Sequence, residues 1–252
     1  MVGTAIAVPA IGSYAGAPSI DALPAALCAN LYVTGLNQLT DRAVDEVNKP
    51  SLPLARKVLS PRDAKIIVTF AGIASLVCAR SSVALFTTIL ASDVLGTLYS
   101  VEPFRWKRRP LLAALSIVAV RGPLVNIGLY SHAIGSLAVP YGPTCFFSAF
   151  ACVIAILKDV PDMRGDTIHG LPSYALRFGH KAVLSASAVI LSSSLVVAAL
   201  CLSRYLSVCA FAMALSIVLR TFLATTLNTS TTELYQYYWK CFFACYASLF
   251  FV

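Results

Sequence analysis

Apolar residues dominate long stretches of the chain, and short polar segments separate these stretches. Nine apolar stretches can be distinguished, near residues 1–17, 22–40, 64–80, 82–100, 110–130, 143–158, 182–201, 205–225 and 234–252. Most of them approach the roughly 20 residues that a helix needs to cross the hydrocarbon core of a bilayer. Because a backbone in lipid must satisfy its own hydrogen bonds, the pattern predicts an all-α integral membrane bundle of about nine helices.

The composition agrees with a membrane protein. Of the 252 residues, 58% are hydrophobic and only 12% are charged. Soluble domains carry about a quarter charged residues, roughly twice this fraction. We therefore expect residues 1–252 to form a single transmembrane domain. The sequence starts inside its first apolar stretch, so that helix is expected to be truncated, and no signal or transit peptide is recognised.

The charged residues are concentrated in three polar segments. Fourteen of the 19 lysines and arginines lie within residues 42–65, 105–109 and 158–181, which follow the second, fourth and sixth apolar stretches. All three segments should therefore emerge on the same side of the membrane. A basic bias on one side is typical of topology signals and explains part of the pattern. However, eight of the eleven acidic residues lie in or beside the same segments, which indicates a polar site rather than a nucleic-acid surface.

Three polar side chains near the end of the second stretch share one spacing. Asn37, Asp41 and Asp45 are separated by four residues, which places them on one face of a helix. Two aspartates stacked in this way repel each other by roughly 0.2–0.5 kcal/mol. Their position at the end of a membrane helix adds to the cost. Mg²⁺ would offset this cost, because it prefers carboxylate and phosphate oxygens.

A second set of aspartates follows the sixth stretch. Asp162 and Asp166 repeat the spacing of four, and Asp159 precedes them. A single acidic stripe at a helix end is usually just a solvated surface. Two stripes with matched spacing on one side of the membrane instead predict a magnesium site that holds a diphosphate. We expect the metal ligands, which are also the catalytic residues, to be Asp41, Asp45, Asp162 and Asp166.

The segment after the fourth stretch adds four positive charges. Arg105 and Lys107 are suited to phosphate oxygens, because arginine offers a planar fork and lysine a point charge. Arg108 and Arg109 could equally bind anionic lipid headgroups. We expect the substrate diphosphate to be contacted by Asn37, Lys49, Tyr99, Arg105, Lys107, Lys158 and Asp159.

Other polar residues point to structure rather than to a site. The eight cysteines lie scattered in apolar stretches without a C-x-x-C pair, so we interpret them as small packing residues rather than as disulfides or zinc ligands. The three histidines show no metal-ligand spacing. Asp93 and Arg121 lie within apolar stretches, and we expect them to neutralise each other.

The aspartate pattern resembles the paired signature of UbiA-type membrane prenyltransferases. The strings Gly35–Ala55 (GLNQLTDRAVDEVNKPSLPLA), Tyr99–Arg108 (YSVEPFRWKR), Lys158–Asp166 (KDVPDMRGD) and Tyr238–Tyr246 (YWKCFFACY) are similar to the homogentisate prenyltransferase branch. Residues 120–126 look like the solanesyl-transferring relatives, whereas residues 175–181 look like the phytyl-transferring ones.

The resemblance implies a nine-helix bundle around a central cavity, with a cap over the magnesium and diphosphate. It implies transfer of a prenyl group from a prenyl diphosphate to an aromatic acceptor, homogentisate, in a plastid membrane, on the way to tocopherols or plastoquinone. The chain departs from the branch at two positions. Arg164 stands where an acid is usual, and Thr40 replaces an aromatic residue.

Several alternatives stay open at this point. A membrane terpene cyclase would use the same metal chemistry without an aromatic acceptor. An inactive relative would bind a diphosphate or lipid without turnover, and a transporter would bury acids beside a cavity. Tyr99, Tyr174 and His169 are candidates for steering the acceptor, and each could equally serve in packing.

Overall fold

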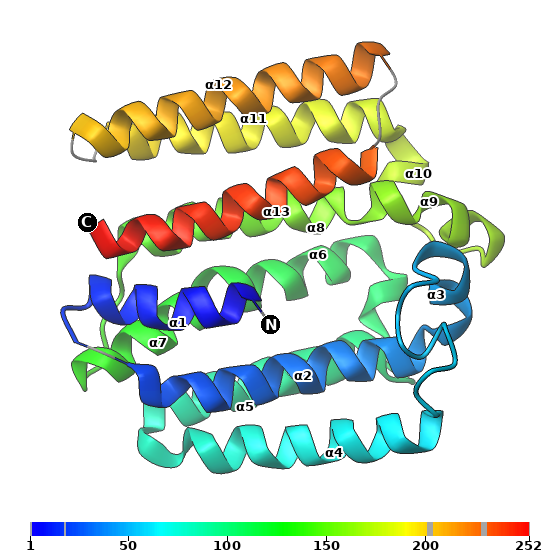
Figure 1. Ribbon diagram of the computed structural model, residues 1–252, viewed down its shortest axis with the longest axis horizontal. Helices are drawn as coiled ribbons and strands as arrows, with labels where there is room; N and C mark the ends of the chain where they lie inside the picture. The colour runs from blue at the N-terminus through cyan, green and yellow to red at the C-terminus, as the bar shows by residue number, and fades with distance from the viewer. Residues whose placement is uncertain (1, 18, 201–203, 228–230, 252) are drawn as a thin grey trace.

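The computed structural model describes residues 2–17, 19–200, 204–227 and 231–251 (Figure 1). Within these ranges every regular element is a helix, which confirms the all-α prediction. The long helices are α1 (Val2–Tyr14), α2 (Leu23–Thr40), α4 (Pro61–Cys78), α5 (Val83–Ser100), α6 (Pro110–Ala119), α7 (Val125–Ile134), α8 (Tyr141–Leu157), α11 (His180–Ala199), α12 (Arg204–Leu227) and α13 (Thr231–Ser248).

Short elements connect the long helices. They are α3 (Arg42–Asn48), α9 (Asp159–Ile168), α10 (Tyr174–Phe178), the π-helical turn η4 (Val120–Leu124) and the 3₁₀ turns η1 (Ile20–Ala22), η2 (Ala79–Ser81), η3 (Trp106–Arg108) and η5 (Leu249–Phe251). Because η4 joins α6 to α7, each of the nine expected stretches corresponds to one helical segment of the described chain. By length and composition, six segments could cross a membrane: Pro61–Ser81, Val83–Ser100, Pro110–Ile134, Tyr141–Ile168, His180–Ala199 and Leu206–Thr226.

Serine and proline set the beginnings of several helices. Ser60 precedes α4 and accepts a hydrogen bond from the Asp63 amide at 3.1 Å. Ser82 precedes α5 and accepts from the Leu85 amide at the same distance. Such caps satisfy amides that have no partner inside the helix. Proline occupies the first position of α4 and of α6, where its missing amide hydrogen costs nothing.

The helices run alongside one another and leave one polar end (Figure 1). α11 and α12 form one flank, α2, α4 and α5 the other, and α1, α6, α7, α8 and α13 lie between them. α3, α9, α10 and the connection from α5 to α6 gather at one end of the bundle. These are the three charged segments of the sequence, so the prediction that they share one side is confirmed.

The outer faces of the bundle are apolar. On α4 the side chains of Ile66, Phe70 and Ile73 are exposed, and on α12 those of Leu215 and Phe222. Large exposed apolar surfaces are unfavourable in water but match a lipid surrounding. The seven described cysteines are free, as expected, and Cys201 lies outside the described residues.

Inside the bundle, glycine allows helices to approach closely. A Cβ atom built on Gly128 of α7 would lie 1.8 Å from Oγ1 of Thr88 on α5, and one on Gly122 would lie 2.3 Å from Oγ of Ser148 on α8. Small residues at such contacts are typical of membrane helix packing, because van der Waals contact replaces the hydrophobic effect there.

The segment from α6 to α7 contains a π-helical turn at Val120–Leu124. Pro123 lies inside this turn and has no amide hydrogen to donate, so the local hydrogen-bond pattern has to change. The fully buried Asn126 compensates, because its amide donates to the carbonyl oxygens of Gly122 at 2.6 Å and Arg121 at 3.1 Å.

The expected ion pair between Asp93 and Arg121 is wrong. Asp93 faces α4, where its carboxylate lies 2.7 Å from Oγ of Ser75. Arg121 faces α13 instead, with its Cζ atom 4.9 Å from the centre of the Trp239 ring. The π-helical turn shifts the helix register at Arg121, so spacing counted for a regular helix did not give its direction.

The glycine contact between α5 and α7 can be tested by adding a single methyl group. We expect Gly128→Ala to lower the free energy of unfolding by about 1–3 kcal/mol, because the new Cβ overlaps Thr88. Thermal unfolding in detergent measures the effect. Gly142→Ala is the matched control, since nothing lies within 4 Å of a Cβ there. An unchanged melting temperature for Gly128→Ala would contradict the close packing.

Candidate active site

The first aspartate stripe, which consists of Asn37, Asp41 and Asp45, keeps its helical spacing across a break in the helix. α2 ends at Thr40, and Asp41 has non-helical backbone angles before α3 begins. The amide of Asp41 nevertheless donates to the carbonyl of Asn37 at 2.9 Å, and the amide of Asp45 to that of Asp41 at 2.8 Å. The spacing of four therefore continues through the junction, and the stripe runs from a membrane helix into the cap.

Asp41 is surrounded by positive charge. Nζ of Lys107 lies 2.6 Å from Oδ1 of Asp41, and Nη2 of Arg105 lies 3.5 Å from the same oxygen. Lys107 also donates to Oγ1 of Thr40 at 2.7 Å and to Oδ1 of Asn37 at 3.4 Å. Burial lowers the pKa of Lys107, although Asp41 acts in the opposite direction. The basic segment after α5 thus lies directly on the first aspartate stripe.

Asn48 joins the two aspartate stripes. Its side-chain amide donates to the backbone carbonyl of Asp162 at 3.0 Å, and its Oδ1 accepts from the amide of Gly165 at 2.7 Å. A Cβ on Gly165 would lie 2.4 Å from that oxygen, so glycine is required for this approach of α3 to α9. Nζ of Lys49 also lies 2.7 Å from Oδ2 of Asp162. The structure therefore brings the two stripes together.

Asp159 has a different environment. It is buried, and Oδ1 lies 2.5 Å from Nζ of Lys158. Oδ2 accepts a hydrogen bond from the amide of Tyr174 at 3.3 Å. Asp159 thereby fixes the start of α10 to the start of α9. Its position suits a supporting residue rather than a direct ligand.

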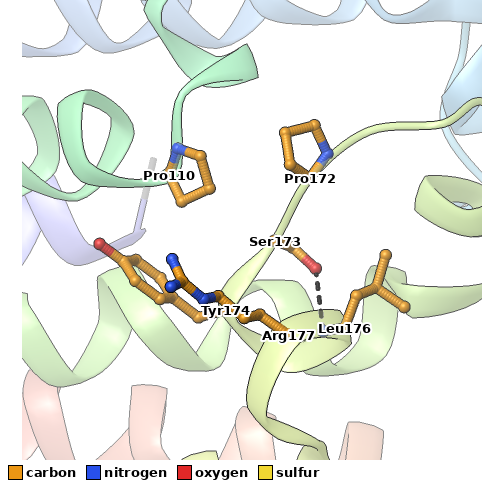
Figure 2. Close-up of a pocket in the computed structure, with 6 residues that line it drawn as sticks. All are labelled: Pro110, Pro172, Ser173, Tyr174, Leu176 and Arg177. Atoms are coloured by element: carbon orange, nitrogen blue, oxygen red, sulfur yellow. Dashed lines mark hydrogen bonds between the residues drawn. The ribbon is translucent and has the colours of Figure 1, made fainter.

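A pocket of about 390 Å³ lies next to this contact (Figure 2). Figure 2 shows Pro110 and Pro172 on one side of the pocket and the side chains of Tyr174 and Arg177 on the other. Tyr174 therefore lies at the cap beside Asp159. His169 is exposed at the end of α9, and Tyr99 is partly buried near the end of α5.

Arg108 and Arg109, which the sequence left open between phosphate and lipid headgroups, face outward. Arg108 is about half exposed and forms an ion pair of 3.1 Å with Glu102, which also binds Arg105 at 3.2 Å. Arg109 is exposed. Surface ion pairs of this kind contribute little to stability. Arg108 and Arg109 thus lie on the outer surface of the cap, whereas Arg105 and Lys107 face the aspartates.

Three carboxylate groups keep oxygen atoms without protein partners. Asp45 and Asp166 are buried, and neither forms an ion pair within the described residues. Oδ1 of Asp162 is enclosed and has no hydrogen-bond donor. Burial raises the pKa of Asp45 to about 6, with Lys49 opposing this and Asp41 adding to it. Such oxygens are the donors that a hard divalent cation binds.

The donor set suits a cation in chemistry, but it is not assembled as a closed metal cage. Among the described residues, no group of three or more His, Cys, Asp or Glu side chains lies close enough to share one ion. The ammonium groups of Lys49 and Lys107 lie against Asp162 and Asp41 instead. They supply the positive charge that a metal ion would bring.

Sequence reasoning missed two residues of this arrangement. Asn48 lies within the string Gly35–Ala55 that resembles the homogentisate prenyltransferase branch, but nothing in the sequence shows that it reaches α9. Thr40 was noted only as a departure from the branch, whereas in the structure its hydroxyl orients Lys107. Both are short polar side chains at helix ends, which is the signal that could have identified them.

The environment of Asp45 makes a pH-dependent stability test possible. Because the folded state raises the pKa of Asp45 from 3.8 to about 6, its ionised form destabilises the metal-free protein above that pH. We expect Asp45→Asn to raise stability at pH 8 by roughly 1–3 kcal/mol, with a gain that shrinks as the pH falls from about 6 to 4. Thermal unfolding in EDTA measures this.

Glu46→Gln is the control for this test. Glu46 is the next residue of α3, its side chain is 44% exposed and it pairs only with Arg42. We expect the stability of Glu46→Gln to match that of the unchanged protein at pH 8 and at about pH 4. A destabilising Asp45→Asn at pH 8 would contradict the described environment of Asp45.

Known proteins share much of this sequence. The sequence matches the profile of the UbiA prenyltransferase family over residues 1–247. It is 37% identical over 253 residues to homogentisate phytyltransferase 1, chloroplastic, of Arabidopsis thaliana, a match that covers 91% of this chain and 64% of that protein. It is 40% identical over 176 residues to the homogentisate phytyltransferase of Synechocystis, covering 67% of this chain and 57% of that protein. The chain thus spans under two thirds of the length of these curated relatives.

Solved structures share the fold. A UbiA homolog from Archaeoglobus fulgidus, bound to DMAPP and Mg²⁺, superposes with a TM-score of 0.69 at 18% identity, covering 99% of this chain and 94% of that chain. The apo structure of a UbiA homolog from Aeropyrum pernix K1 gives 0.71 at 19% identity, covering 98% and 94%. With the profile match over nearly the whole sequence, these findings show that the chain belongs to the UbiA prenyltransferase family.

Proposed function

We propose that this chain transfers a prenyl group from a prenyl diphosphate to homogentisate in a plastid membrane, as a single domain over residues 1–252. The observation that carries the proposal is the contact between the two aspartate stripes, made by Asn48 and Lys49 and bordered by Lys107 and Arg105. The names of the plant and cyanobacterial relatives support homogentisate as the acceptor, and the plant name supports the plastid. The product would lead toward tocopherols or plastoquinone.

Asp41, Asp45, Asp162 and Asp166 are the residues that would hold Mg²⁺. When bound, this ion supplies positive charge to the diphosphate oxygens as the carbon–oxygen bond of the donor breaks. The solved relative with DMAPP and Mg²⁺ supports this cofactor for the fold. In this chain, the fit rests on the buried and unpaired carboxylate oxygens of Asp45, Asp162 and Asp166.

The basic residues of the site can exchange partners when a diphosphate binds. Lys49 and Lys107 are bound to Asp162 and Asp41 in the structure described here. Phosphate oxygens are stronger acceptors for arginine and lysine than water is, so the diphosphate offers these cations a second partner. Lys49, Lys107 and Arg105 would then stabilise the charge that develops on the leaving group.

The remaining predicted residues support this arrangement. Asn37 accepts a hydrogen bond from Lys107, and Asp159 holds Lys158 close to the second stripe. Lys158 and Tyr99 lie near enough to interact electrostatically. We assign Asn37, Lys158, Asp159 and Tyr99 to orienting the diphosphate and its cations.

The allylic carbon–oxygen bond breaks and its electron pair leaves with the diphosphate. A ring carbon of the acceptor forms the new carbon–carbon bond and then loses its proton. With homogentisate, the side-chain carboxylate departs as carbon dioxide and the benzylic carbon takes up a proton. The apolar helices around the site keep water from capturing the carbocation.

The carboxylate roles can be tested in membranes that contain the inserted protein. We expect Asp41→Asn and Asp162→Asn to reduce prenyl transfer by roughly 100-fold or more. Each change removes a carboxylate charge that holds in place the cations that stabilise the departing diphosphate. Glu46→Gln on the exposed face of α3 serves as the control and should keep its rate. EDTA should abolish activity and Mg²⁺ should restore it. Full activity in either aspartate variant would contradict the assignment of that aspartate to the diphosphate site.

The identity of the acceptor is tested by product analysis. Membranes are incubated with ring-labelled homogentisate and, in turn, phytyl, geranylgeranyl and solanesyl diphosphate. We expect a prenylated ring product that depends on both substrates. A prenyl-derived hydrocarbon formed without homogentisate would instead indicate a terpene cyclase. Mg²⁺-dependent binding of a diphosphate without any product would indicate an inactive relative.

A further inference from the structure

Arg121 is a positive charge in the middle of an apolar segment. It lies in the π-helical turn between α6 and α7, inside the segment Pro110–Ile134 that is long and apolar enough to span a membrane. Placing arginine at such a depth is costly, and such residues usually serve a function and have a partner. The catalytic arrangement described above does not use this residue.

The guanidinium of Arg121 has no anionic partner. In the described part of the chain, no carboxylate lies within 4 Å of it, and no protein atom accepts a hydrogen bond from it. Its side chain is partly buried, and its nitrogen atoms are not among the fully enclosed polar atoms without a partner. The unpaired donors of Arg121 are therefore not sealed off by protein atoms, and a further hydrogen-bond acceptor can reach them.

The direction of this side chain is fixed. The amide of Asn126 binds the backbone carbonyl of Arg121, and Oδ1 of Asn126 accepts from the hydroxyl of Tyr246 at 3.4 Å. On the other side, the guanidinium lies over the Trp239 ring with Cζ 4.9 Å from its centre. Stacking on an aromatic face orients the guanidinium and leaves its in-plane donors free.

Aromatic side chains of α13 lie between Arg121 and the aspartate end of the bundle. The guanidinium lies over Trp239, and the centres of the Trp239 and Tyr235 rings lie 6.3 Å apart. α13, which carries both rings, packs against α9, which carries Asp162. The ring that attacks the prenyl group has to lie beside the departing diphosphate, and this row of aromatic rings leads from Arg121 toward that position.

We propose that Arg121 binds the carboxylate of the aromatic acceptor, which makes an arylacetate anion the preferred acceptor class. This inference rests on the proposed function and deepens it. The planar guanidinium matches the two oxygens of a carboxylate. The diphosphate already has Lys49, Lys107 and Arg105 on the aspartate side, so Arg121, beside Trp239, serves a second anion. The apolar surroundings strengthen this ion pair and exclude acceptors that cannot neutralise Arg121.

Arg220 provides a matched control inside the same protein. Its Cζ lies 4.3 Å from the centre of the Tyr237 ring, so it makes the same kind of stacking contact as Arg121. However, Arg220 is exposed on α12 and takes no part in the proposed site. A purely structural role for stacked arginines would affect both positions, whereas carboxylate binding would affect Arg121 alone.

The test compares two acceptor analogues by binding rather than by turnover. The purified full chain is saturated with Mg²⁺ and an unreactive prenyl thiolodiphosphate, and the Kd values of homogentisate and of its neutral primary amide are measured. We expect the acid to bind about 10–100 times more tightly than the amide, as a charged hydrogen-bonded pair would give. In Arg121→Gln this preference should fall to about one, in Arg121→Lys it should be intermediate, and in Arg220→Gln it should be unchanged.

Several results would overturn the proposal. Equal affinities of acid and amide in the unchanged protein would do so without any variant, which covers the case in which Arg121→Gln fails to fold. A preference for the acid over the amide that survives in Arg121→Gln would also overturn the proposal. So would an Arg121→Gln variant that binds the thiolodiphosphate more weakly but keeps its affinity for the acid. Absence of prenyl transfer alongside an intact, Arg121-dependent preference would reject the proposed function and leave the carboxylate site standing.

Discussion

Carboxylates gathered at the polar end of a membrane bundle have to be neutralised, and the rest of this structure depends on how that is done. Asp41 and Asp162 are each paired with a lysine from another segment, whereas Asp45 and Asp166 are buried and form no ion pair with any residue that the structure describes. Charges in such surroundings interact more strongly than in water. The same residues that make the cap costly to assemble without a metal ion make it suited to binding a cation and a diphosphate.

The two halves of the chain contribute comparable parts to this end of the bundle. α2 continues into α3 and α8 continues into α9, so each stripe extends from a long helix into the cap. Asn48 fastens one extension to the other, and Gly165 lets them approach. The basic segment after α5 then closes the third side through Lys107. Deeper in the bundle, the π-helical turn turns Arg121 toward α13 and provides a second, separate positive charge.

Much of this could be predicted from the sequence, because the decisive signals are local. Apolar length gives the helices, charge distribution gives their common polar side, and the spacing of four gives each aspartate stripe. The spacing held even across the break at Asp41, since hydrogen bonds of the helical type continue through it. The assignment of particular roles to these residues stays a prediction.

What could not be predicted depends on contacts between distant segments. Asn48 reaches α9 only because Gly165 has no side chain. Nothing in the sequence around either residue indicates this contact. Asp93 and Arg121 carry opposite charges in neighbouring segments, yet Asp93 binds Ser75 and Arg121 stacks on Trp239. The direction of Arg121 follows from the π-helical turn, which Pro123 and Asn126 produce together. Residue spacing alone does not reveal such a change in helix register.

The most direct test of the central claim is a structure of the chain with Mn²⁺ and an unreactive prenyl diphosphate analogue, with the metal located by anomalous scattering. We expect the metal signal and the diphosphate between Asp41 and Asp45 on one side and Asp162 and Asp166 on the other, with the prenyl chain running into the bundle. A metal bound outside the two stripes, or a diphosphate bound with no metal beside it, would contradict the account.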